Sequence, residues 1–454
     1  MKITKKILII LAITSTLFSG LIYTNPVQAD NSDITKLSSA PEADFTLASE
    51  GAVLMDSSTG KVLYGKNENK KLYPASTTKI ITAILAIENC RPTDKITASY
   101  DAVMSIPSGY SNAAIQSGET LEFQDLLDMF LIHSANEIGN IFAEHISGSI
   151  ENFATLMNEK AAELGCKNTN FTNPSGIHDE NHYSTAYDMA LIAQYCMKNE
   201  TFRNIVSKPT CTIEPTDKYE KRFFRNTNEL LNKSSEYYYK YAIGTKTGYT
   251  GQAKRCLIAT SLKDNLELIT VVLGGPSGYE EDTRYVDTIN LFEYGFSNYT
   301  TKQIATKNTV AKEIVVENAT KETETLSLLI KNDLTALIPS KMKLSNLNSS
   351  VKLNENISAP IAEGQVLGKI TYNIEGIEYS SDLVANHTVE AFDLKTLLKQ
   401  IALALLVLFV LAKILLPKKK SKKKNYKNRN SKNKKSGFKK SRNYKNSNNS
   451  IYKF

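Results

Sequence analysis

Three short motifs stand in one order along this 454-residue chain, and together they predict a site for serine acyl transfer. They are Ser-Thr-Thr-Lys at 76–79, Ser-Ala-Asn at 134–136 and Lys-Thr-Gly at 246–248. Each motif alone occurs by chance in many proteins, but their order and domain-scale spacing are hard to reach by accident. Alanine at 135 stands where the usual second motif has aspartate.

The first motif contains a candidate nucleophile and its base. A serine hydroxyl is a weak nucleophile at neutral pH and needs a base within hydrogen-bond reach. Lys79 lies one helical turn after Ser76 and therefore on the same face. Burial, a helix N-terminus and the positive charge of Lys246 would lower the pKa of Lys79 toward neutrality. The Ser76 amide, in the first turn, is also a candidate oxyanion donor. An isolated motif of this kind is more often a helix-cap serine beside a solvated lysine.

The second and third motifs supply groups that a peptide substrate needs. Ser134 could pass a proton between Lys79 and the leaving group, and the Asn136 amide could orient a peptide. Lys246 would be a fixed cation for a substrate carboxylate, Thr247 a further donor, and Gly248 would allow close approach of an extended ligand. Alone, these residues are equally typical of helix caps and a strand edge.

Hydrophobic periodicity predicts the elements that carry these motifs. A β-hairpin over 52–64 precedes a helix that begins near Ser76, and a second helical segment ends just before Ser134. After Lys246 the pattern becomes β, and a final helix follows. We therefore expect one sheet assembled from both ends of the domain and flanked by helices. The predicted ranges are helices at 123–131, 150–164, 185–197 and 280–294, and strands at 256–261 and 266–273.

Composition divides the chain into six parts. Residues 1–29 resemble a secretory signal peptide, with an uncleaved anchor as the alternative, and 30–47 read as a linker. The predicted catalytic domain covers 48–298, and short β-type runs predict a small β-rich domain over 299–392. A transmembrane helix is expected over 394–416, with an amphipathic surface helix as the alternative.

The tail, 417–454, carries 16 Lys and Arg and no Asp or Glu. Positive residues beside a membrane span stay cytoplasmic, which predicts an exported body and a disordered basic tail inside. Membrane lipids are therefore an expected partner. Nucleic-acid binding is not expected, because membrane topology already explains the charge.

Neither a disulfide framework nor a metal centre is predicted from the sequence. The five cysteines are odd in number and form no C-x-x-C pair, so they read as small buried hydrophobic residues, although one pair could bridge. His178 and His182 bracket Asp-Glu-Asn, but the order differs from H-E-x-x-H and follows a loop signal. We expect no metal and no cofactor.

With these motifs, and with Asn-His-Tyr-Ser-Thr at 181–185, the chain resembles the penicillin-binding D-alanyl-D-alanine carboxypeptidases over roughly residues 52–296. Residues 359–368 resemble the family's C-terminal β-domain. The resemblance implies an α+β fold, with a transpeptidase/β-lactamase-like catalytic domain followed by a small all-β domain. It also implies hydrolysis of the terminal D-Ala-D-Ala bond of peptidoglycan pentapeptide stems, and covalent inhibition by β-lactams.

The resemblance also assigns roles to residues. Ser76 becomes the acyl-enzyme nucleophile, Lys79 the proton acceptor, Ser134 the third catalytic residue and Lys246 the ligand of the substrate carboxylate. The Tyr249 amide becomes the second oxyanion donor beside that of Ser76.

Two other classes of protein share parts of this pattern. A class A β-lactamase adds a glutamate that activates the deacylating water, and the only similar string here, 229–232, has the wrong internal spacing and lies too near Lys246. A non-catalytic wall-binding scaffold would be expected to have lost Ser76, Lys79 or Lys246. The sequence does not distinguish water from an amine as the acyl acceptor.

Overall fold

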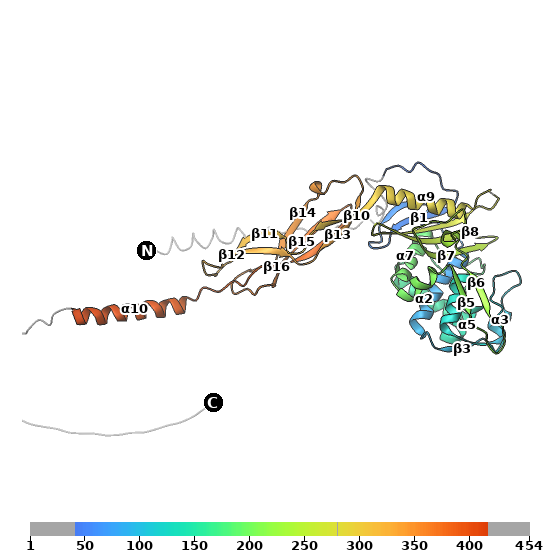
Figure 1. Ribbon diagram of the computed structural model, residues 1–454, viewed down its shortest axis with the longest axis horizontal. Helices are drawn as coiled ribbons and strands as arrows, with labels where there is room; N and C mark the ends of the chain where they lie inside the picture. The colour runs from blue at the N-terminus through green and yellow to red at the C-terminus, as the bar shows by residue number, and fades with distance from the viewer. Residues whose placement is uncertain (1–40, 279, 416–454) are drawn as a thin grey trace, which may run out of the picture. The chain divides into compact units, whose positions relative to one another are not determined.

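A computed structural model describes residues 41–415, apart from Tyr279 (Figure 1). The expected signal peptide at 1–29, the first part of the expected linker and the basic tail lie outside the described residues. The α+β class is confirmed, with a mixed helix and strand domain followed by a domain of strands.

The catalytic domain contains one five-stranded antiparallel sheet. Its order is β2-β1-β9-β8-β7, so the N-terminal hairpin joins strands from the far end of the domain through the pairing of β1 with β9. The predicted hairpin and the predicted assembly from both ends are therefore confirmed. The strands are β1 (Gly51–Asp56), β2 (Val62–Lys66), β7 (Ala242–Thr250), β8 (Lys254–Lys263) and β9 (Leu266–Gly275).

The sheet is buried on both faces. Side chains alternate along a strand, so Val53 and Met55 of β1 join the core shared with the helical block. Ala52 and Leu54 join a second core under α9 (Thr283–Asn298). With both faces covered, β7 has a fixed position from which to present the Lys-Thr-Gly motif.

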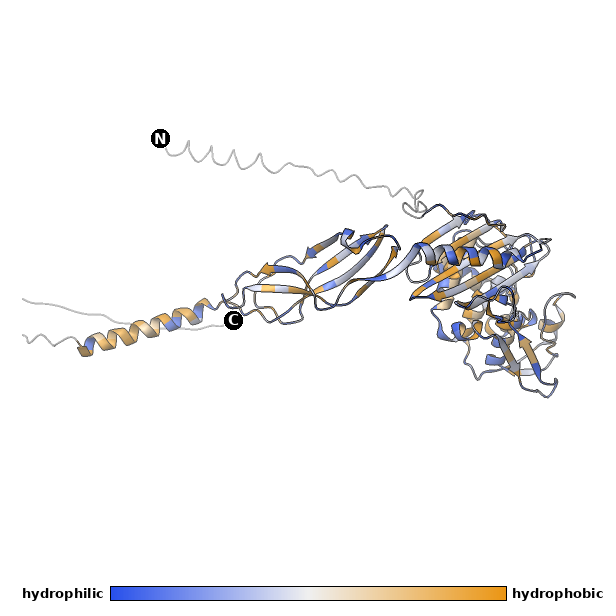
Figure 2. Cartoon of the chain, turned by 45° about the horizontal axis from the view of Figure 1, so that its top comes forward, coloured by the Kyte–Doolittle hydropathy of each residue, from blue (hydrophilic) through white to orange (hydrophobic). Residues whose placement is uncertain are grey.

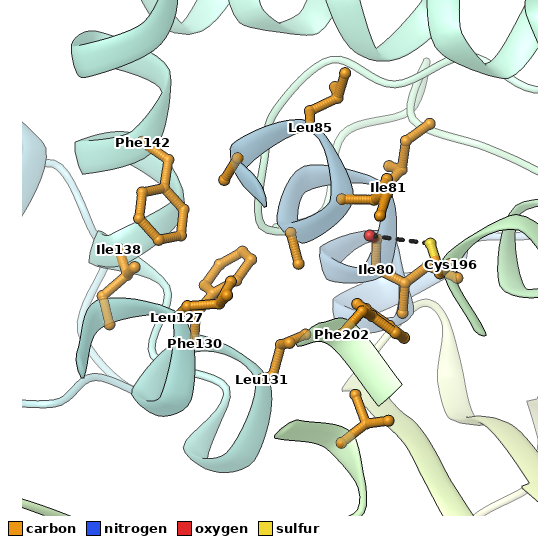
Figure 3. Close-up of a cluster of buried hydrophobic side chains, with 14 of the residues drawn as sticks. Ile80, Ile81, Leu85, Leu127, Phe130, Leu131, Ile138, Phe142, Cys196 and Phe202 are labelled. Carbon is orange, nitrogen blue, oxygen red and sulfur yellow. Dashed lines mark hydrogen bonds between the residues drawn. The ribbon is translucent and has the colours of Figure 1, made fainter. Parts of the chain in front are cut away.

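Helices of the central block pack against one another around large apolar side chains. Figure 3 shows Phe130 and Phe142 among aliphatic residues of this core, with the Cys196 thiol donating to the Ile80 carbonyl oxygen at 3.4 Å. The helices are α2 (Lys79–Asn89), α3 (Tyr100–Met104), α4 (Phe123–Asp128), α5 (Glu137–Ser147), α6 (Ile150–Glu163), α7 (Ala186–Met197) and α8 (Glu200–Val206). The same block contains two small two-stranded sheets, β3 (Lys95–Thr97) with β4 (Thr120–Glu122) and β5 (Thr210–Ile213) with β6 (Arg222–Arg225).

Two local departures from regular α-helix occur at the motifs. The helix expected to begin near Ser76 starts with a 3-10 turn, η1 (Ala75–Thr78), and becomes α-helical only at Lys79. The segment after α4 widens into a π-helical turn, η2 (Met129–His133), that ends at Ser134. π-Helical turns are rare and occur frequently at functional sites.

The C-terminal domain consists of strands around its own apolar core. One sheet has the order β11-β12-β16-β15-β14, and β10 pairs with β13. The strands are β10 (Tyr299–Ala305), β11 (Val310–Val315), β12 (Thr325–Ile330), β13 (Leu334–Pro339), β14 (Ser349–Leu353), β15 (Val366–Ile374) and β16 (Ile377–Ala385). Two further 3-10 turns complete the described elements, η3 (Glu229–Leu231) in the catalytic domain and η4 (Leu344–Asn346) here.

The described end of the expected linker packs onto the catalytic domain. Phe45 packs against Tyr64 in a tilted arrangement and edge-on against Tyr294, with ring centroids 5.6 and 5.9 Å away, and the Tyr294 hydroxyl donates to the Pro41 carbonyl oxygen at 2.9 Å. Aromatic burial explains why these residues belong to the folded domain.

A separate unit that begins at Ala391 contains α10 (Leu394–Leu415), 22 residues with a mean hydropathy of 2.3. In Figure 2, where the chain is coloured by residue hydropathy, most of this helix is hydrophobic. At about 1.5 Å per residue its length is about 33 Å, enough for the roughly 30 Å hydrocarbon core of a bilayer.

Candidate active site

Ser76 and Lys79 meet at the start of α2. The Lys79 Nζ lies 3.0 Å from the Ser76 Oγ, as the motif spacing predicts. Ala75, just before Ser76, has a left-handed φ of 49°, a backbone conformation that costs about 1–3 kcal/mol for a residue with a side chain. The surrounding packing therefore has to hold the nucleophile turn in place.

Lys79 is fully buried and donates to two acceptors besides the serine. The Asn136 Oδ1 and the Ser175 carbonyl oxygen each lie 2.7 Å from its Nζ. Burial places the pKa of Lys79 well below its ordinary value, and the nearby charge of Lys246 lowers it further, while Glu137 opposes the shift. This environment favours the neutral amine that a general base requires.

The Ser175 carbonyl is presented by a tight loop. Asn173 Oδ1 accepts hydrogen bonds from the backbone amides of Ser175, Gly176 and Ile177 at 3.3, 2.8 and 3.1 Å. Gly176 has a φ of +76°, and a Cβ there would lie 1.9 Å from the Ala75 carbonyl oxygen. Only glycine allows the loop to approach the nucleophile turn this closely.

The second motif is held by the π-helical turn. Ser134 follows η2 with a left-handed φ of 69° and is 7 % exposed. Asn136 lies just before α5, where its Oδ1 accepts from Lys79 and its Nδ2 donates to the Ser111 carbonyl oxygen at 2.7 Å. Asn136, expected to orient substrate, is thus engaged with the base and with the 105–119 loop.

The third motif runs along β7 beside the nucleophile turn. A Cβ at Gly248 would lie 3.0 Å from the Pro74 carbonyl oxygen and 3.1 Å from the Ser76 amide nitrogen, so the two segments are in close contact. Lys246 is 1 % exposed, and burial together with Arg284 lowers its pKa to about 7. Its Nζ donates to the Thr247 carbonyl oxygen at 3.0 Å.

The structure therefore brings all three motifs together, with differences in detail. Lys79 bonds Ser76 and Asn136 directly, and the charge of Lys246 acts on Lys79. The Ser134 Oγ is not one of the three acceptors of the Lys79 amine within the described residues. Tyr249 follows Gly248 on β7, where its side chain is 59 % exposed.

Several groups at the site carry no recognisable sequence motif. The Ser175 carbonyl lies in a stretch that reads only as a turn, and Arg284 lies in a helix about forty residues after the last motif. The Arg284 Nη1 is 3.5 Å from the Gly248 carbonyl oxygen, and its charge acts on Lys246. The close spacing of Arg284 and Asp282 was a weak signal of an ion pair, which forms at 2.9 Å.

The histidines considered for a metal have protein partners. His182 is 2 % exposed, its Nε2 lies 2.9 Å from the Thr78 Oγ1, and its Nδ1 accepts from the Thr172 amide at 3.1 Å. Burial lowers the pKa of His182 to about 4, so it is a neutral structural link behind the catalytic turn. His178 packs edge-on against Tyr73. The five cysteines are free thiols.

Comparison with known proteins agrees with this geometry. The family model described as D-alanyl-D-alanine carboxypeptidase matches residues 35–277, and that of the penicillin-binding protein 5 C-terminal domain matches 299–391. The D-alanyl-D-alanine carboxypeptidase DacF of Bacillus subtilis is 37 % identical over 336 residues, which are 72 % of this chain and 82 % of that protein.

Solved structures of penicillin-binding proteins and DD-transpeptidases also align with this chain. Penicillin-binding protein 5 from Haemophilus influenzae aligns with a TM-score of 0.61 at 30 % identity, covering 77 % of this chain and 100 % of that one. A mutant of the Streptomyces K15 DD-transpeptidase aligns with a TM-score of 0.52 at 29 % identity, covering 56 % of this chain and 99 % of that one. With the three motifs assembled around a buried lysine, the chain belongs to the D-alanyl-D-alanine carboxypeptidase family of serine peptidases.

Proposed function

We propose that this protein removes the terminal D-alanine from peptidoglycan stem peptides through an acyl-enzyme on Ser76. The observation that carries the proposal is the contact of 3.0 Å between the buried Lys79 amine and the Ser76 hydroxyl. Family membership supports the substrate class.

The partners of Lys79 aim its lone pair at the nucleophile. A neutral amine has two protons and one lone pair. The Asn136 Oδ1 and the Ser175 carbonyl oxygen accept only, so they take the two protons. The third position carries a proton toward the Ser76 Oγ in the charged amine; in the neutral amine it is the lone pair, which can accept the Ser76 proton during attack.

The remaining roles follow from position and chemistry. The backbone amides of Ser76 and Tyr249 are the proposed oxyanion donors, because β7 passes beside the nucleophile turn. Ser134 is proposed to pass the proton to the departing D-alanine amine. Lys246 and Thr247 are proposed to bind the substrate's terminal carboxylate, and Gly248 to leave room for the extended peptide.

A β-lactam adduct on Ser76 is proposed to be hydrolysed slowly. The loop that contacts Lys79, at 172–177, contains no acidic residue that could activate a water as a β-lactamase glutamate does. Covalent β-lactam adducts should accordingly persist. The likeness to the K15 DD-transpeptidase makes an amine the competing acyl acceptor.

The test measures released D-alanine and adduct lifetime with the full-length protein in detergent. We expect D-alanine release from a peptide ending in D-Ala-D-Ala, and a fluorescent penicillin adduct that outlasts many peptide turnovers. Adding a glycine-containing amine acceptor shows whether part of the acyl group goes to transpeptidation. Rapid penicillin turnover would instead identify a β-lactamase, and absence of both release and adduct would refute the acyl-enzyme.

We further propose that α10 anchors the protein in the cell membrane, with the catalytic domain outside and the basic tail in the cytoplasm. The support is the length and apolar composition of α10, with the charge of the residues that follow it. Full-length protein is expected to stay in the membrane pellet after alkaline carbonate extraction, whereas a chain ending at 393 is released. Release of the full-length chain would contradict the anchor.

A further inference from the structure

Thr227 lies where three parts of the catalytic domain meet. Its amide donates to the Ile132 carbonyl oxygen of η2 at 3.2 Å, and its carbonyl oxygen accepts from the Tyr285 hydroxyl of α9 at 3.1 Å. Its hydroxyl lies 2.6 Å from the hydroxyl of Thr247, in the third motif. The turn that precedes Ser134 and the strand that carries Lys246 are thus linked through this one residue.

The residues beside Thr227 hold it rigidly. The Asn226 Nδ2 donates to the Lys208 carbonyl oxygen at 2.9 Å, and its Oδ1 accepts from the Asn228 amide at 2.9 Å. The Asn228 Oδ1 in turn caps η3 by accepting from the Leu230 amide at 3.2 Å. Asn226 and Asn228 are buried, whereas Thr227 between them keeps partial exposure. The backbone position of Thr227 is therefore set before substrate arrives.

The hydrogen bond between the two threonine hydroxyls can run in either direction, and the direction determines what Thr247 can offer a substrate. Each hydroxyl has one proton and two lone pairs. If Thr247 donates to Thr227, it offers a substrate carboxylate only lone pairs, which repel it. If Thr227 donates to Thr247, the Thr247 proton is free for the carboxylate, in a charge-assisted hydrogen bond.

We propose that Thr227 is a positioning residue that donates its hydroxyl proton to Thr247, so that Thr247 donates to the terminal carboxylate of the substrate. The inference rests on the proposed function, because it requires a substrate with a free carboxylate at the third motif. It adds to the site a residue that belongs to none of the three motifs.

The test compares Thr227→Val and Thr227→Ser in the full-length protein in detergent. Valine keeps the shape and removes the hydroxyl, whereas serine keeps the donor. We expect Thr227→Val to lower kcat/KM for D-alanine release by about tenfold, mainly through a higher KM, because one hydrogen bond to a charged group is weakened. Thr227→Ser should stay within about twofold of the unchanged protein, a rescue that a purely structural role would not predict.

A double-mutant cycle with Thr247→Val completes the experiment. Because Thr227 acts through the Thr247 hydroxyl, adding Thr227→Val to Thr247→Val should cost no further activity. Additive losses, a serine variant as poor as valine, or unchanged KM in Thr227→Val would each overturn the inference. If Thr227→Val shows a lowered unfolding temperature, Thr227→Ala takes its place with the same expectations. Lack of D-alanine release by the unchanged protein would refute the proposed function instead.

Discussion

Replacing Ser76 with alanine is expected to abolish both penicillin labelling and D-alanine release. Among the described residues, the substitution removes the only oxygen that the Lys79 amine contacts and that can form an ester. Loss of a nucleophile that acts as a unit with its base lowers kcat by about 10⁴-fold or more. Fluorescence of the labelled band after electrophoresis and chromatography of released D-alanine measure the two losses.

A matched control separates loss of chemistry from loss of fold. Ser207, after α8, is exposed, and its hydroxyl bonds only the Asn204 carbonyl oxygen at 2.9 Å among the described residues. Ser207→Ala should keep label and release at the unchanged level. Both variants should unfold at nearly the same temperature as the unchanged protein. A stable covalent adduct on Ser76→Ala would show that another residue is the nucleophile.

Replacing Lys79 with arginine should lower the acylation rate by about 10²–10⁴-fold, the usual contribution of a general base. A guanidinium remains protonated at any working pH and therefore offers no lone pair to Ser76. The measurement is the rate of penicillin labelling at several pH values. If arginine retained most of the rate, Lys79 would act as a fixed cation and not as the base.

The pH dependence of the unchanged protein gives a second readout of the same lysine. A base acts when deprotonated, so activity should rise as pH rises through the pKa of Lys79. Lys246→Gln removes the neighbouring charge that lowers this pKa, so the rising limb should move to higher pH, whereas Lys246→Arg should leave it in place.

The charge of Lys246 itself is expected to cause a fall in activity at alkaline pH. Its pKa of about 7 means that positive charge is lost as pH rises above that value, so KM for a carboxylate substrate should increase there. Arginine at 246 stays charged and should remove this increase. An unchanged alkaline limb in Lys246→Arg would assign that limb to another group.

The sequence predicted that the motifs come together better than it predicted the contacts that support them. Helical spacing alone placed Lys79 beside Ser76, and the order of the predicted elements, a hairpin first and strands with a helix last, correctly predicted that β1 and β9 share a sheet. These features depend on local periodicity, which a single sequence displays. The 3-10 turn at 75–78 was missed because its backbone is set by the glycine loop that packs against it.

Contacts made by backbone atoms, and contacts between residues far apart in the sequence, cannot be recognised from residue types alone. The Ser175 carbonyl bonds Lys79 whatever side chain it carries, and the Ser111 carbonyl holds Asn136 in the same way. Thr227 lies twenty residues before Thr247 in a stretch with no apolar period, and only the tertiary fold brings the two hydroxyls together. Such contacts require the fold to be known first.

The orientation of Ser134 depends on the number of residues in the π-helical turn at Met129–His133 that precedes it. Each residue advances an α-helix by about 100°, so a chain one residue shorter here would be expected to form a regular helix and to rotate Ser134 away from its present position. The apolar residues of this stretch could exchange with one another at modest cost, because the core tolerates swaps of similar volume. Inserting or deleting one residue between Phe123 and Ser134 is therefore expected to harm activity more than most substitutions there. The number of residues in this segment is itself a requirement of the active site.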